Sequence, residues 1–343
     1  MKALQIQAPG VIKEIERIEQ LTNAGDVKFR VLKVLITESD LRNYLGISKT
    51  PKYPIIPGRF AVGMVDSVGS ESHGLTKGTK IFINPVSPCK ACNACMSNNP
   101  DQCSDLQTAS VNKDGYLCDF VIHPAGLLYE LPKTVSEEAA LYTSHVALSL
   151  KIMEKLKIEK GSHVVIVGAN LLGNILAQIC HYYKAVPIVI DKNETKLEAV
   201  KNKGIYYTLN SEDGVNEKIN EITGGRFAEK VVFITNSGEN VELAAQISAY
   251  GGAVCFSGFC YESVNINFST AIKKQLNVYS LCSCAGKDKI LSALNALANN
   301  ALNIEGLSKK TVTYEQSVNE IADMAELFKQ KKNKAFVVDL IKF

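Results

Sequence analysis

The ten residues from Val164 to Gly173 read Val-Val-Ile-Val-Gly-Ala-Asn-Leu-Leu-Gly, and this stretch decides the fold. Its first four residues form a continuous apolar run, which is typical of a strand buried on both faces of a sheet. A glycine-containing turn follows, and an apolar helical pattern then extends from Leu171 to about Tyr183. A buried strand that passes through a glycine turn into a helix is the first unit of a doubly wound parallel sheet.

The same alternation continues for about a hundred residues. Further strands are predicted at 187–190, 205–208, 231–234, 253–256 and 276–281, with helices near 194–202, 213–222 and 240–249. Six strands with helices between them predict a parallel Rossmann sheet, and we assign residues 151–286 to this domain.

The sequence on either side of this domain has a different hydrophobic pattern. Short apolar runs at 31–36, 61–68, 80–83 and 120–122 are broken by glycine and proline, which predicts an irregular β-rich domain over residues 1–150. The tail, residues 287–343, reads as helix, extended segment, helix and a last apolar run from Ala335 to Val338. The chain as a whole is therefore of the α/β class.

Composition narrows the class of function. The chain has 343 residues, 46% hydrophobic and 21% charged, with a net charge of +3. These values exclude a disordered chain and give no reason to expect nucleic acid or a membrane surface as partner. The N-terminus lacks the apolar core of a signal peptide, and no run is long enough for a membrane span. We expect a cytoplasmic protein with a small-molecule substrate.

The glycine turn indicates a dinucleotide site. Gly168, Asn170 and Gly173 occupy the positions of a G-x-G-x-x-G fingerprint, with asparagine in place of the second glycine and Leu171 opening the helix. Asp191 closes the second strand, where a carboxylate binds the ribose 2′-hydroxyl and repels a 2′-phosphate. This pattern predicts NAD rather than NADP. Two alternatives stay open: a doubly wound sheet without a nucleotide, and Asp191 as a residue at the start of the next helix.

Four of the ten cysteines form a candidate metal centre. Cys89, Cys92, Cys95 and Cys103 follow a C-x2-C-x2-C-x7-C pattern, and four thiolates close the coordination sphere of a tetrahedral Zn²⁺. A closed sphere predicts one structural zinc per chain. An iron–sulfur cluster or a loop of free thiols also fits the spacing. The other six cysteines, which read as buried packing residues, are Cys118, Cys180, Cys255, Cys260, Cys282 and Cys284.

The combination resembles the medium-chain dehydrogenase/reductase superfamily, specifically its zinc-containing alcohol and polyol dehydrogenase branch. The resemblance spans essentially the whole chain and depends on the four-cysteine segment, the Pro57-Gly58 turn, the Asp114-Gly115-Tyr116 segment and the nucleotide-binding half. It implies a GroES-like catalytic domain, made of residues 1–150 and the tail, around an inserted Rossmann domain. It also implies a homodimer or homotetramer, often joined through the last strand of the nucleotide sheet.

The sequence departs from this branch at the catalytic zinc. The resemblance places the zinc ligands at three positions, where this chain has Thr37, the pair Arg59-Phe60, and Thr143. Arginine is permanently cationic and phenylalanine has no donor atom, so neither binds a metal. We therefore predict that the chain has no catalytic zinc.

Four residues are candidates for catalysis in the absence of a catalytic zinc. Arg59 places a fixed charge near a developing oxyanion, and it also suits a carboxylate or phosphate on the substrate. Ser39 matches the proton-relay hydroxyl of the family, and His145 is a candidate acid. Asp40 is the fourth candidate, although Arg59 pairing with Asp40 or Glu38 is the structural alternative. Capping explains Ser39 equally well, and packing explains His145 and the further phenol Tyr44.

Three functions remain open from the sequence. The first is an NAD(H)-dependent oxidoreductase that interconverts an alcohol with a ketone or aldehyde without a catalytic zinc. The second is a zinc-independent reductase of a conjugated carbon–carbon double bond. The third is a catalytically inactive pseudoenzyme that keeps the fold and the structural zinc.

Overall fold

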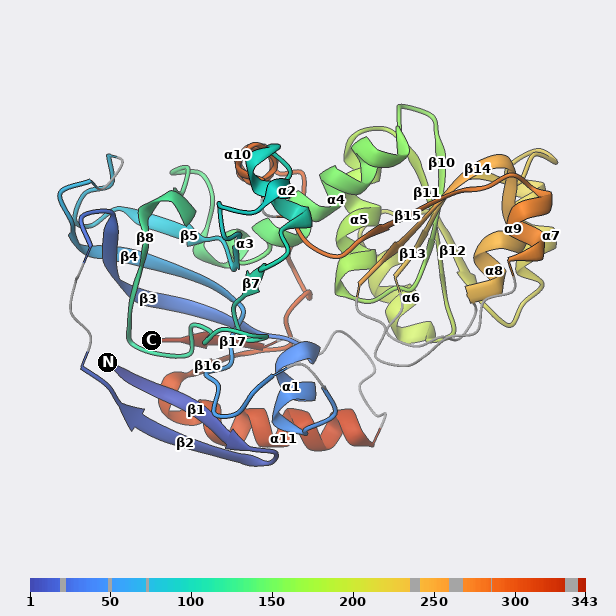
Figure 1. Ribbon diagram of the computed structural model, residues 1–343. Coiled ribbons are helices and arrows are strands. Elements are labelled where there is room, and N and C mark those ends of the chain that lie inside the picture. Colours follow the sequence, from blue (N-terminus) through green and yellow to red (C-terminus); the bar gives the residue numbers. More distant parts are fainter. Residues whose placement is uncertain are drawn as a thin grey trace.

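The computed structural model describes residues 1–18, 23–48, 51–71, 74–234, 241–258, 268–284, 286–330 and 339–343. Two large sheets lie side by side, with helix α4 (Thr143–Leu156) between them (Figure 1). Among the described residues, no helix is both long and apolar enough to cross a membrane.

The nucleotide sheet has six parallel strands in the order β12-β11-β10-β13-β14-β15. The chain starts at the centre, builds one half outward and then returns to build the other, which is the Rossmann arrangement. The predicted fold of this half is confirmed. The strands are β10 (His163–Val167), β11 (Val186–Asp191), β12 (Tyr207–Asn210), β13 (Ala228–Phe233), β14 (Ser248–Ser257) and β15 (Asn277–Leu281).

Helices cover both faces of this sheet, as Figure 1 shows. Side chains of β10 alternate between two cores: Val164 and Ile166 pack on one face, and Val165 and Val167 on the other. The continuous apolar run is therefore buried on both faces, as predicted. The helices are α5 (Leu171–Tyr182), α6 (Glu194–Lys201), α7 (Val215–Ile222), α8 (Val241–Gln246) and α9 (Ser269–Lys273).

The second sheet has seven strands and combines both ends of the chain. Its order is β16-β17-β3-β4-β5-β9, and β8 also pairs with β3. Strand β17 runs antiparallel to β3, so the tail returns to the N-terminal half. The strands are β3 (Asp26–Ile36), β4 (Phe60–Val68), β5 (Lys80–Ile83), β8 (Phe120–Pro124), β9 (Leu128–Glu130), β16 (Thr311–Thr313) and β17 (Asp339–Lys342).

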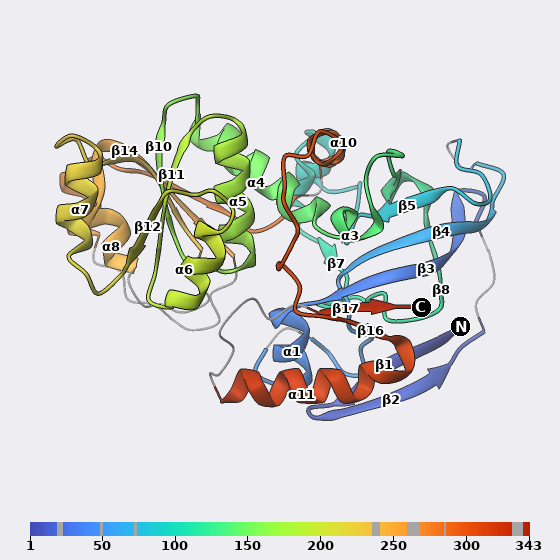
Figure 2. The same ribbon diagram turned by 180° about the vertical axis from the view of Figure 1, so that it is seen from behind.

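Smaller elements complete the GroES-like half. A hairpin of β1 (Lys2–Ala8) and β2 (Val11–Glu16) packs beside α11 (Figure 2). The short strands β6 (Val86–Ser87) and β7 (Gln107–Thr108) close the base of the cysteine segment. The helices are α1 (Glu38–Tyr44), α2 (Asn93–Met96), η1 (Pro100–Gln102), η2 (Ala125–Leu127), α3 (Glu137–Ala140), α10 (Lys287–Ala298), η3 (Tyr314–Gln316) and α11 (Ser317–Lys329).

Two expectations need adjustment. The helix predicted at 240–249 ends at Gln246, because residues from Ser248 already belong to β14. The last apolar run, Ala335 to Val338, lies outside the described residues.

Candidate active site and metal centre

The glycine turn has the geometry that its sequence requires. Gly168 has a φ of +113°, a conformation that residues with a side chain rarely adopt. A Cβ on Gly173 would lie 1.9 Å from the carbonyl oxygen of Gly168, so only glycine fits there. Strand β10 and helix α5 therefore approach closely, and the helix N-terminus faces the carboxyl end of the sheet, where doubly wound folds bind ligands.

Asn170 has a structural role in this turn. Its Oδ1 accepts a hydrogen bond from Gly173 N at 3.0 Å, which makes it the N-cap of α5. Its Nδ2 donates to the carbonyl of Ile234 at 2.9 Å and so connects the turn to the end of β13. The residue that departs from the fingerprint thus fixes the turn, and Leu171 begins the helix.

Asp191 ends β11 beside the same turn. One carboxylate oxygen accepts from Ala169 N at 2.8 Å, and the other accepts from Asn193 N at 2.9 Å. The N-cap of α6 is Asn193, so the alternative in which Asp191 caps that helix is wrong. Each carboxylate oxygen can accept more than one hydrogen bond, which leaves capacity for a ribose hydroxyl.

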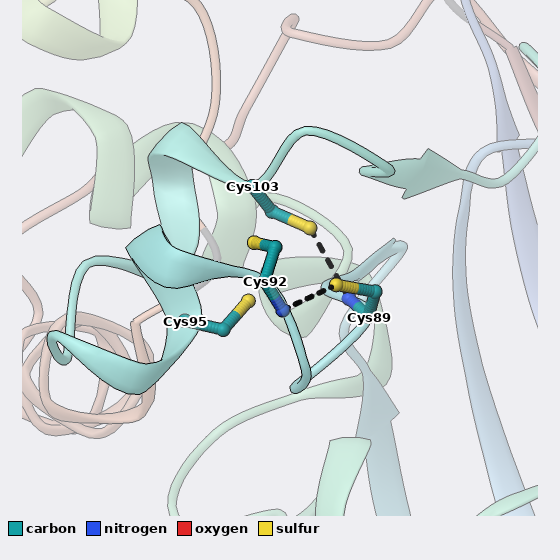
Figure 3. Close-up of side chains that lie close together, drawn as sticks. All are labelled: Cys89, Cys92, Cys95 and Cys103. Carbon is teal, nitrogen blue, oxygen red and sulfur yellow. Dashed lines mark hydrogen bonds between the residues drawn. The ribbon is translucent and has the colours of Figure 1, made fainter.

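The structure brings the four predicted metal ligands together (Figure 3). The sulfur atoms of Cys89, Cys92, Cys95 and Cys103 all lie within 4.8 Å of one another. A tetrahedral zinc with Zn–S bonds of about 2.3 Å holds its sulfurs about 3.8 Å apart, so modest side-chain movement closes the site. The donor set fits Zn²⁺ and leaves no position open for substrate.

Backbone hydrogen bonds favour the thiolate state at Cys92, whereas burial raises the pKa of Cys95 to about 12. Cys89 N donates to Cys103 Sγ at 3.2 Å, and Cys92 N donates to Cys89 Sγ at 3.3 Å. The backbone N–H groups of Cys95 and Ser104 lower the pKa of Cys92 to about 5. Thiolates are the form that binds metal, so this backbone favours coordination.

The segment around the cysteines lacks an apolar core of its own. We call residues 87–108 the cysteine lobe; of these, only Cys103 is buried. A segment with so little buried surface depends on cross-links for its shape, and a metal held by the four sulfurs would supply them.

The remaining cysteines divide differently from the prediction. Cys118, Cys180, Cys255 and Cys284 are buried, as expected of packing residues. Cys282 is exposed, so that prediction was wrong for it: it directly follows the edge strand β15. Cys260 lies outside the described residues.

Two contacts join the three segments that carry the positions of the missing zinc ligands. Asp40, on α1, accepts a hydrogen bond from Gly58 N at 2.8 Å, which joins α1 to the residue before Arg59. The Phe60 ring packs at a tilt of 49° against the His145 ring of α4, with ring centres 4.6 Å apart. None of the side chains at these positions supplies the donor set of a zinc site. Thr143 is itself buried, and its hydroxyl donates to the carbonyl of Ala140.

The Asp40 carboxylate is buried and accepts hydrogen bonds from three segments of the chain. It is 1% exposed, and its oxygens accept from Gly58 N, the Ser110 hydroxyl, Thr37 N and the Thr37 hydroxyl. Four donors explain how this carboxylate remains buried, and they make Asp40 a positioning residue. Ser110 was missed from the sequence, because it lies 70 residues away and has no motif.

A chain of hydroxyls ends at this carboxylate. The Thr37 hydroxyl donates to Asp40 Oδ2 at 3.0 Å and lies 3.0 Å from Ser39 Oγ. Threonine has a single hydroxyl proton, so in this arrangement Ser39 donates and Thr37 accepts. The lone pairs of Ser39 then remain available to accept a proton. Thr37, and not Ser39, is the N-cap of α1.

His145 is uncharged at neutral pH. Burial, and next the charge of Arg59, lower its pKa to about 3, while its Nδ1 is buried without a hydrogen-bond partner. The imidazole therefore offers hydrogen bonding, and the expected role as a cationic acid does not suit it. The Arg59 guanidinium lies 5.8 Å from the Phe60 ring centre, on the same cluster. Tyr44 donates to the carbonyl of Gly10, consistent with the packing interpretation.

Comparisons with known proteins agree with this geometry. Residues 23–133 match the family model for the alcohol dehydrogenase GroES-like domain, and residues 172–299 match that for zinc-binding dehydrogenase. An uncharacterised zinc-type alcohol dehydrogenase-like protein of Haemophilus influenzae is 28% identical, over 95% of each chain. An NAD-dependent alcohol dehydrogenase of Sulfurisphaera tokodaii is 26% identical, over 81% of this chain and 80% of the relative.

A solved structure shows the same fold. The RspB protein of Escherichia coli CFT073, described as a short chain alcohol dehydrogenase complexed with NADH, superposes with a TM-score of 0.87 and 22% identity. The superposition covers 100% of this chain and 99% of the other. With the two family matches and the paired architecture, the chain belongs to the zinc-type alcohol and polyol dehydrogenase branch of the medium-chain dehydrogenase/reductase superfamily, a family of oxidoreductases.

Proposed function

We propose that this protein is an NAD(H)-dependent oxidoreductase that interconverts an alcohol with a ketone or aldehyde without a catalytic zinc. One structural zinc per chain stays at Cys89, Cys92, Cys95 and Cys103. The observation that carries the proposal is that Thr37, Arg59, Phe60 and Thr143 occupy the ligand positions, in segments joined by the Asp40–Gly58 hydrogen bond and the Phe60–His145 ring contact. These residues offer no zinc donor set, yet they retain a cation and a hydroxyl chain.

The coenzyme supplies the hydride chemistry when bound. Gly168, Asn170, Leu171 and Gly173 would place its pyrophosphate at the N-terminus of α5, where backbone N–H groups favour an anion. Asp191 would hydrogen-bond the adenosine ribose, and its carboxylate would repel a 2′-phosphate. The NADH complex of the fold relative described above supports this coenzyme.

Arg59 would stabilise the negative charge that develops on the substrate oxygen. Its guanidinium is always protonated, so it acts at any working pH. A fixed donor aimed at a developing oxyanion contributes about 100-fold or more to a rate. His145 would add a neutral hydrogen bond, because the neighbouring cation and its burial keep it unprotonated.

Ser39 would move the proton. In the oxidation direction the alcohol C–H leaves as hydride and its O–H proton passes to Ser39 Oγ. The proton of Ser39 passes to Thr37, and that of Thr37 moves toward the Asp40 carboxylate. The reverse sequence protonates the alkoxide formed when a carbonyl is reduced.

Turnover of NADH with a panel of substrates tests the proposal. The panel contains simple ketones and aldehydes, polyol-derived ketones with and without a carboxylate or phosphate, and conjugated enones. We expect carbonyl reduction with about one zinc per chain. We also expect Arg59→Met to lower kcat/KM by about 100-fold. Arg30→Met, which removes an exposed arginine on β3, is the matched control.

Other outcomes would replace the proposal. Activity confined to enones would favour a double-bond reductase, and NADH binding without turnover would favour a pseudoenzyme. Activation of the purified protein by added zinc would contradict the zinc-free mechanism.

A further inference from the structure

We propose that the cysteine lobe positions the coenzyme-binding end of the nucleotide sheet, and that Lys151 is the positioning residue that connects them. The inference rests on the proposed function, because the ligand affected is NAD(H). It assigns to the lobe and its metal a role beyond local stability.

Lys151 contacts both structures from helix α4. Its Nζ lies 2.6 Å from Asp101 Oδ2 and donates to the carbonyl of Ser283 at 3.3 Å. The side chains of Lys151 and Asp101 are only 19% and 18% exposed. Such a pair is less screened by solvent than a surface ion pair, so breaking it displaces its partners rather than merely rehydrating them.

Asp101 lies two residues before Cys103, one of the four predicted metal ligands. It lies in η1, which ends one residue before Cys103, the one buried residue of the lobe. Since the lobe lacks an apolar core, the metal fixes the path of η1 and therefore the position of the Asp101 carboxylate.

Ser283 lies where the coenzyme is expected. It follows β15 by two residues, at the carboxyl end of the parallel sheet, which is the end that binds ligands in this fold. The Ser257 hydroxyl donates to the carbonyl of Leu281 at 2.7 Å, so the ends of β14 and β15 are held together. A shift of Ser283 is therefore transmitted to both strand ends.

The Lys151 charge also acts on two cysteines near the ends of β14 and β15. Burial raises the pKa of Cys255, on β14, and of Cys284, after β15, to about 12 each, and Lys151 opposes the rise at both thiols. Asp101 and Asp288 face Cys284 as well. One cation thus lies among the lobe, β14 and the exit from β15.

Helix α4 also provides a control. Glu154, one turn further along, pairs with Lys289 of α10 at 2.8 Å. In both ribbon views α10 lies near α4 and outside the nucleotide sheet (Figures 1 and 2). Lys289 also pairs with Asp288, so the control removes the charge of Glu154, which no contact among the described residues joins to the lobe or the strand ends.

The test measures NADH affinity by fluorescence titration of the full chain, with zinc loaded and after removal by a chelator. We expect Lys151→Met to raise the Kd for NADH about fivefold in the zinc-loaded protein. Removing zinc from the unmodified protein should raise it similarly, with little further increase in Lys151→Met. Lys151→Arg should restore affinity, and Glu154→Gln should leave it unchanged. Circular dichroism verifies folding, and Asp101→Asn serves as a second variant.

Three results would overturn the inference while leaving the proposed function intact. The first is an unchanged Kd in both Lys151→Met and Asp101→Asn. The second is an equal loss of NADH affinity in Glu154→Gln. The third is a loss of NADH affinity on zinc removal that is as large in Lys151→Met as in the unmodified protein. An unmodified, zinc-loaded protein that does not bind NADH would instead contradict the proposed function, and this inference with it.

Discussion

At the scale of single residues, Gly173 has the least freedom to change. Its missing side chain is what allows α5 to start against the carbonyl of Gly168. By contrast, Asn170 departs from the fingerprint and is accommodated, because its amide satisfies Gly173 N and the Ile234 carbonyl. The residue type matters at position 173 because a side chain does not fit there, and at position 170 because the side chain forms hydrogen bonds.

We expect Gly173→Ala to abolish measurable NADH binding and to lower the free energy of unfolding by about 2 kcal/mol or more. The added Cβ would force α5 away from β10 and displace the pyrophosphate site. Titration with NADH and thermal unfolding measure the two effects. Gly25→Ala is the control, since a Cβ there meets no atom within 4 Å. Normal binding by Gly173→Ala would show that the turn does not contact the coenzyme.

Two histidines with lowered pKa values predict how stability depends on pH. Burial is the largest influence on each, and it lowers the pKa of His145 to about 3 and that of His123 to about 4. The unfolded chain protonates histidine near pH 6.5, so acidification from about pH 6.5 toward 4 should favour unfolding. Each group contributes at most about 1.4 kcal/mol per pH unit.

His145→Gln should therefore flatten the dependence of unfolding free energy on pH over this window. Denaturant titrations at several pH values measure the slope, with His181→Gln, on the outer end of α5, as the control. An unchanged slope in His145→Gln would mean that the imidazole is not held neutral.

At the scale of elements, the cysteine lobe shows how a segment keeps its shape without a core. Its two helices, α2 and η1, bury no residue of their own. We expect a metal on the four sulfurs, together with the ion pair to α4, to hold it instead. The shape of the lobe should therefore depend on metal far more than either sheet does.

Cys103→Ser should lower the zinc content from about one per chain toward zero and make residues of the lobe susceptible to proteolysis. Elemental analysis and limited trypsin digestion measure these changes. Cys282→Ser, which alters an exposed thiol outside the lobe, should keep the metal. Full zinc occupancy in Cys103→Ser would exclude this thiolate as a ligand, and iron in the unmodified protein would indicate a different centre.

At the scale of the whole molecule, the free edge of the nucleotide sheet predicts assembly. Strand β15 is the last of six, and an edge strand presents unpaired backbone groups. Val278 on this strand is 47% exposed, and Phe268 and Ile272 beside it are 53% and 73% exposed. We expect a second copy to pair along β15 about a two-fold axis.

Val278→Lys should accordingly reduce the molar mass in solution by half, as measured by light scattering. Tyr206→Lys is the control, because this residue is exposed just before β12, at the opposite edge. A monomeric unmodified protein, or a variant of unchanged mass, would contradict the expected interface.

Local sequence determined the secondary structure, the glycine turn and the cysteine cluster of this protein. Hydrophobic periodicity predicts the strands and helices, because a strand and a helix bring apolar side chains to one face at different sequence spacings. Glycines mark positions where a Cβ does not fit, and the cysteine spacing specifies a metal loop. These features act over a few residues, so the Rossmann order and the four-sulfur cluster could be predicted. The helix at 240–249 was overextended, since apolar residues near its end serve β14 equally well.

Only the tertiary structure decided which distant groups meet. Ser110 on Asp40, and Lys151 between Asp101 and Ser283, are contacts across 50 to 132 residues that no local pattern encodes. The environment of His145 was also unpredictable, because burial and a neighbouring cation lower its pKa and remove the role as a charged acid. Short-range sterics and periodicity are written in the sequence, whereas desolvation and long-range pairing arise only once the chain has folded.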